Sequence, residues 1–73
     1  MTTDNEKTIN QIEASIVMLE EIAAKETRTV RRYAMLAARD HYLFAAAALR
    51  HGQTDRAGRH LEAARTIIME ARA

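Results

Sequence analysis

The sequence contains no cysteine, no proline and no tryptophan, and it has only two glycines among its 73 residues. The absence of cysteine excludes a disulfide framework and a thiolate metal site. A chain this short buries only about 60% of the surface that its unfolded form exposes, so small domains usually need disulfides, metals or oligomerisation. We therefore expect one domain over residues 1–73 that associates with a second copy of itself.

Long apolar runs are also absent. The first residues, Met1 to Lys7, are polar and lack the basic end followed by an apolar run that marks a signal peptide. No stretch approaches the roughly 20 apolar residues that a membrane span requires. We expect a cytoplasmic protein with no membrane partner, and its size alone suggests a bacterium or a mobile element such as a phage.

Residues that carry catalysis are scarce. Ser15 is the only serine, and it has no nearby base to activate it. Asp40, His41 and Tyr42 are adjacent, but neighbours on a helix point about 100° apart and do not form a relay. Metal binding requires three or four converging ligands, and no paired His and carboxylate motif occurs. The sequence predicts no enzyme activity, no metal and no cofactor, and it favours His41 as a hydrogen-bonded core histidine.

Helix-forming residues fill most of the chain, and an apolar seam follows its first part. Thr3 followed by Glu6 matches a capping box, so a helix is expected to begin near residue 4. Apolar residues then recur at spacings of three and four, the pattern of a coiled-coil contact. We expect this N-terminal seam to join two copies of the chain through Ile9, Ile12, Ile16 and Leu19.

One helix end is unambiguous. Gly52 fits the left-handed position after a helix that ends at His51, and Thr54 or Asp55 can cap the helix that follows. By contrast, residues 25–30 have low helix propensity but contain no Gly, Pro, Asn or Asp to mark a turn.

The expected fold is all-α, either an antiparallel helical hairpin or a three-helix unit, which dimerises into a helical bundle. Its helices span about residues 4–26, 28–51 and 54–72, and the first two are either separate or one continuous helix.

The middle segment carries a second apolar strip. A broad apolar arc runs along one side of residues 30–50, whereas Leu36 and Leu43 fall on the opposite side, seven residues apart. Surface helices usually have a single apolar stripe, and arginines bordering an apolar strip are typical of protein interfaces. The alternative is that this strip receives the first helix in a three-helix bundle. The expected partner-binding residues are Arg28, Arg32, Leu36, Arg39, Tyr42 and Leu43.

Charge is divided unevenly along the chain. Residues 1–26 carry six acids against two lysines, a net charge of −4, and residues 27–73 carry nine arginines against four acids, a net charge of +5. The two parts are expected to attract each other within a bundle or across an antiparallel dimer, and such asymmetry also accompanies nucleic-acid binding. Against nucleic-acid binding, acids alternate with arginines in the last helix, and no aromatic residues interleave with the arginines.

Residues 38–68 resemble a single tetratricopeptide-type helical hairpin, which implies two closely packed helices and a protein-binding role. The matching residues are Gly52, Asp55, Ala57, Leu61 and Ala64. The closing proline is missing, and three positions depart from the family pattern: Ala45 stands where glycine is typical, His41 where a large residue is common, and Gly58 where a larger residue is usual. A solenoid needs at least three such repeats.

These features predict a small protein-binding module, a homodimer that inhibits a larger partner in the manner of an anti-activator by occluding one of its surfaces. Leu36, Tyr42 and Leu43 would be its apolar anchors, and the arginines would pair with carboxylates of the partner. The alternative is a small nucleic-acid-binding regulatory protein that uses the arginines of residues 28–65.

Overall fold

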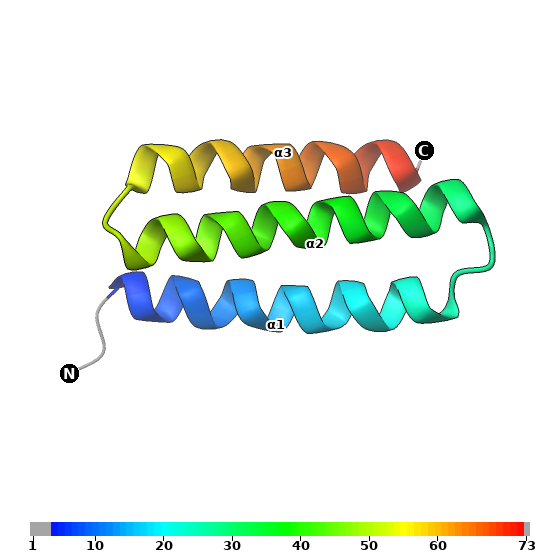
Figure 1. Ribbon diagram of the computed structural model, residues 1–73, viewed down its shortest axis with the longest axis horizontal. Coiled ribbons are helices and arrows are strands. Elements are labelled where there is room, and N and C mark those ends of the chain that lie inside the picture. Colours follow the sequence, from blue (N-terminus) through cyan, green and yellow to red (C-terminus); the bar gives the residue numbers. More distant parts are fainter. Residues whose placement is uncertain (1–3, 73) are drawn as a thin grey trace.

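The computed structural model describes residues 4–72, which form three α-helices: α1 (Asp4–Lys25), α2 (Thr29–Arg50) and α3 (Thr54–Arg72). The helices run antiparallel, with α2 in the middle (Figure 1). Within residues 4–72, α2 packs against both neighbours, whereas no Cα atom of α1 comes within 8 Å of one in α3. The expected all-α class and the three-helix unit are confirmed.

The first two helices are separate, which overturns the alternative of one continuous helix. The chain leaves the helical conformation at residues 26–28, and Arg28 has an extended backbone with φ −81° and ψ 118°. The Glu26 carboxylate accepts a hydrogen bond from the Arg28 backbone N–H at 3.0 Å. A side chain therefore satisfies the backbone at this turn, so the turn needs no residue that conventionally marks one.

Gly52 ends α2 as the sequence predicts. Its φ is +72°, a left-handed conformation that a residue with a Cβ rarely adopts. The Gly52 N–H bonds to the Leu49 carbonyl at 3.1 Å and the Gln53 N–H to the Ala48 carbonyl at 2.8 Å, the paired pattern of a Schellman motif.

The sequence predicts Thr3 as the cap of the first helix and Thr54 or Asp55 as the cap of the last. Thr3 lies outside the described residues, although α1 does begin at Asp4. Thr54 is already the first residue of α3, and the Ala57 N–H bonds to the Gln53 carbonyl at 3.0 Å. The capping position is therefore Gln53, one residue before the expected Thr54 and two before the expected Asp55.

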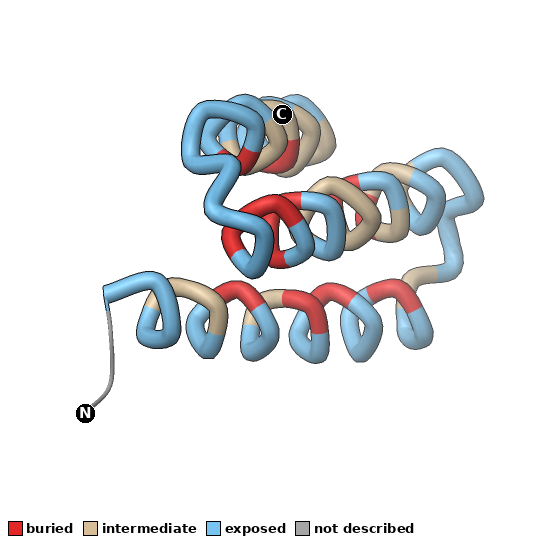
Figure 2. The backbone as a smooth tube through the Cα atoms, turned by 60° about the vertical axis from the view of Figure 1, so that its left-hand side comes forward, coloured by how far each residue is buried: buried red, intermediate tan, exposed pale blue. Residues whose placement is uncertain are grey.

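The core is built from α1 side chains that pack onto an alanine-rich α2. Ile12, Ile16 and Leu19 are 4%, 8% and 5% exposed, and Ile9 packs against the same core. Figure 2 shows the buried positions of α1 along the side that faces α2. The predicted N-terminal seam therefore packs against α2 of the same chain. The sequence suggested instead that it joins two copies of the chain.

Ion pairs add to the contact between α1 and α2. Arg39 pairs with Glu20 at 3.4 Å, and Arg50 pairs with Glu13. The acidic first part of the chain and the basic second part thus attract each other within one molecule, one of the two arrangements that the charge division predicts.

Candidate protein-binding groove

An apolar groove of about 470 Å³ runs between α1 and α3, with α2 as its floor. It exists because both outer helices pack on α2 while their own Cα atoms stay more than 8 Å apart, so a fourth helix position of a bundle is left open. Its lining is mainly apolar and consists of Ser15, Met18, Leu19, Ile22, Glu26, Arg31, Met35, Tyr42, Ile68, Ala71 and Arg72.

The wall that α1 contributes to the groove carries two exposed apolar side chains. Met18 and Ile22 are one turn apart on α1, and they are 60% and 43% exposed. They lie beside the N-terminal seam, and they remain uncovered because that seam alone faces α2. Methionine is flexible and polarisable, so Met18 and the floor residue Met35 suit a groove that adapts to an apolar ligand.

Charged side chains gather at one end of the groove. Glu26, Arg31 and Arg72 line this end, which lies near the connection between α1 and α2. The Nε of Arg31 donates a hydrogen bond to the Ala71 carbonyl at 3.0 Å, so Arg31 caps the C-terminus of α3. Two arginines against one glutamate leave this end of the groove with positive charge.

The predicted residues Arg32, Leu36, Arg39 and Leu43 are spaced four, three and four apart, so they share one face of α2, and that face does not line the groove. Leu43 is 47% exposed, but Leu36 is half-buried against the core. Tyr42 lines the groove, about 100° around α2 from Leu43. Arg28 and Arg32 are exposed at the start of α2. Of the six predicted residues, only Tyr42 belongs to the groove.

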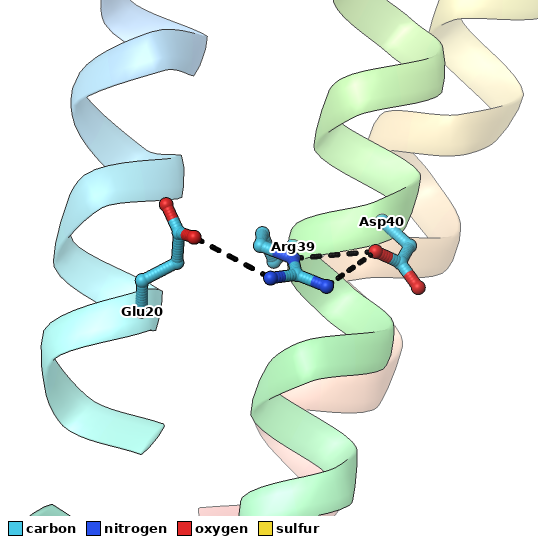
Figure 3. Close-up of polar contacts among 3 residues, drawn as sticks. All are labelled: Glu20, Arg39 and Asp40. Atoms are coloured by element: carbon cyan, nitrogen blue, oxygen red, sulfur yellow. Dashed lines mark hydrogen bonds and ion pairs between the residues drawn. The ribbon is translucent and has the colours of Figure 1, made fainter. Parts of the chain in front are cut away.

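Arg39, the remaining predicted residue, already has partners inside the chain. Its guanidinium lies between Glu20 of α1 and Asp40 of α2, with Nη2 3.0 Å from the Asp40 carboxylate (Figure 3). The hydrogen bond with Asp40 is the main cause that raises the pKa of Arg39 above its usual value. A partner's carboxylate would therefore have to displace these two internal acids.

Sequence reasoning missed Met18 and Ile22. Their signal was present, because they are apolar, four residues apart and offset from the N-terminal seam. This offset indicates that the two side chains are exposed only once the helix that packs on the N-terminal seam is known. With α2 on the seam, these two side chains have no cover.

Two groups of the arginines proposed for nucleic-acid binding lie far apart. Arg28, Arg31 and Arg32 lie at the beginning of α2, whereas Arg56 and Arg59 lie in the first two turns of α3, beside the last turns of α2. Arg65 lies farther along α3. A helix rises 1.5 Å per residue, so about 25 Å of α2 separates Arg31 from Ala47 and Ala48, which lie beside Arg56. The two groups are therefore not adjacent.

A pair of histidines joins α2 to α3 away from the groove. The Nδ1 atoms of His41 and His60 are 3.0 Å apart, and the rings of Phe44 and His60 have centroids 5.3 Å apart. The expected hydrogen bond of His41 is thus present, although the imidazole is half-buried. Desolvation is the main cause that lowers the pKa of His60 below its usual value, and His41, Arg56 and Arg59 lower it further.

No helix within residues 4–72 has the length and apolarity needed to cross a membrane. In the same part of the chain, no three His, Asp or Glu side chains are grouped to hold a metal ion. Comparison with known protein families, with characterised proteins and with solved structures gives no match.

Proposed function

We propose that the chain is a small protein-binding module that receives an amphipathic helix of a larger partner protein in the groove between α1 and α3. The observation that carries this proposal is the apolar lining of the groove, where Met18 and Ile22 are exposed beside Met35 and Ile68. A helix in such a groove buries its apolar residues, spaced three and four apart, against these walls. It would occupy the fourth position of a helical bundle.

The charge of the groove favours one orientation of that helix. Arg31 and Arg72 lie at the end near the connection between α1 and α2, where Glu26 is the single acid. The C-terminus of a helix carries partial negative charge, and acidic side chains there would pair with the arginines. We therefore expect a partner helix that ends in acidic residues at this end of the groove.

Occlusion is the proposed effect on the partner. A partner helix held in the groove has its apolar face covered and is unavailable to its other binding surfaces. This preserves the inhibitory role that the sequence suggests and moves its site from the Leu36 and Leu43 strip to the groove.

Site-specific photocrosslinking in the cells that produce the protein tests this proposal. A photoreactive residue replaces Met18 inside the groove, and the same residue replaces Val17, which is 55% exposed but outside the groove, as the matched control. We expect position 18 to form adducts that map to a helix with apolar residues three and four apart. Introducing Ile22→Glu should abolish these adducts.

Several outcomes would overturn the proposal. Equal adducts at positions 17 and 18, or adducts that survive Ile22→Glu in a folded protein, would exclude the groove as the binding site. Adducts formed only with a second copy of the chain would show that the groove is a dimer contact.

A further inference from the structure

The contact between His41 and His60 is the polar link between α2 and α3 at the middle of α2. Their Nδ1 atoms are 3.0 Å apart, and both side chains are half-buried. An imidazole nitrogen either donates or accepts, so the neutral pair forms this bond with one Nδ1 protonated and the other not. The geometry therefore accommodates one proton between the two facing atoms.

The surroundings of the pair supply positive charge and no compensating carboxylate. Arg56 and Arg59 act on His60 from its own helix, and both raise the positive potential there. Asp40 precedes His41 on α2, but its carboxylate is held by Arg39. Among the described residues, no acid is hydrogen-bonded to either imidazole, and no Cα atom of α1 comes within 8 Å of one in α3.

We propose that the His41–His60 contact is a pH-sensitive latch between α2 and α3, which opens when both imidazoles are protonated. A single added proton leaves one imidazolium that still donates to a neutral neighbour. A second proton places two N–H groups and two positive charges face to face at 3.0 Å. The second protonation therefore requires the two rings to move apart, which breaks this polar link between the helices.

The direction of the pH dependence follows from proton uptake. Desolvation and the nearby positive charges lower the pKa of His60 in the folded chain, whereas an unfolded histidine titrates near 6.5. The contribution to stability is complete above pH 6.5, because both states are then neutral. It is lost as the pH falls, because the unfolded chain binds a proton that the folded chain does not.

Opening of the contact between His41 and His60 affects the groove through α3. α3 packs on α2, and Ile68 and Ala71 of α3 form one wall of the groove. Loss of the bond between the histidines would weaken the attachment of α3 to α2. The latch would hold this wall more firmly near neutral pH than in acid.

Equilibrium unfolding of the full chain at pH 7.5 and pH 5.5 tests the latch. We expect acidification to raise the unfolding equilibrium constant of the unaltered chain by up to about tenfold more than that of His60→Gln or His41→Gln, since each variant lacks the second proton. His51→Gln is the matched control, because His51 is exposed and outside the pair. It should keep the full loss of stability.

Imidazole ¹⁵N shifts of the unaltered chain provide a readout that does not depend on the folding of any variant. We expect the shifts of His60 to change at a lower pH than those of an unfolded histidine, which titrates near 6.5. The latch is wrong if His60 titrates at or above that pH. It is equally wrong if His60→Gln retains the loss of stability that the His51→Gln control shows.

Discussion

Alanine is the residue that sets how closely α2 approaches its two neighbours. Ala38, Ala45 and Ala64 are completely buried, and Ala46 and Ala57 are almost so. A side chain with a single methyl group keeps helix axes close, and large apolar side chains from α1 fill the remaining space. The core therefore depends on small size at these positions as much as on apolar character.

Substitution of one buried alanine by leucine tests this dependence. Ala45→Leu adds three carbon atoms at a completely buried position, and we expect it to destabilise the chain by about 1–3 kcal/mol. Ala47→Leu is the control, because Ala47 lies on the same helix but is exposed, and its effect should stay within about 0.5 kcal/mol. Denaturant unfolding measures both. Equal effects of the two substitutions would contradict the close packing described for α2.

The two glycines differ in whether their backbone conformation requires glycine. Gly52 ends α2 with φ +72°, whereas Gly58 lies inside α3, and an added Cβ at either position meets no atom within 4 Å. Space is therefore not the difference between the two sites. The difference is backbone conformation, because a side chain is strained only in the left-handed region.

The same substitution at both glycines should consequently have opposite effects. We expect Gly52→Ala to destabilise the chain by about 1–2 kcal/mol, and Gly58→Ala to stabilise it by about 0.5–1 kcal/mol, since alanine loses less backbone freedom in a helix. Thermal unfolding of the two variants against the unaltered chain measures these shifts. Destabilisation by Gly58→Ala would indicate that α3 requires glycine for an unseen contact.

At the element scale, the sequence predicts where helices lie more accurately than what they contact. The helical periodicity and Gly52 locate three helices to within about one residue of their observed ends. The break near Thr27 was left open because its turn uses the Glu26 carboxylate, which bonds the Arg28 backbone. A side-chain contact of this kind leaves no compositional signal. The resemblance of residues 38–68 to a tetratricopeptide-type hairpin stays a prediction.

The groove was beyond prediction for a different reason. Period and composition identify an apolar face but do not identify the surface that covers it. The N-terminal seam was assigned to a second copy of the chain, whereas α2 covers it. Because α2 covers the N-terminal seam, Met18 and Ile22 beside it are left exposed, and Leu36 of α2 is half-buried.

At the scale of the whole molecule, stability depends on α1 staying on α2. Stabilities of about 0.05–0.15 kcal/mol per residue correspond to about 4–11 kcal/mol for a chain of this length. Removal of one large core side chain costs about 2–5 kcal/mol, and a buried unpaired carboxylate adds to that cost. A single charged side chain placed in the N-terminal seam is therefore expected to remove most of the free energy of unfolding.

Ile12→Asp separates the two roles that have been considered for this seam. If the seam packs on α2, as the structure has it, this variant should lose most of its cooperative unfolding transition by circular dichroism. If the seam instead joins two folded copies, the variant should be a folded monomer by sedimentation equilibrium. Val17→Asp is the control, because Val17 is 55% exposed on the same helix, and its stability should change by no more than about 0.5 kcal/mol. A folded, monomeric Ile12→Asp chain beside a dimeric unaltered chain would return the seam to the role of a dimer contact.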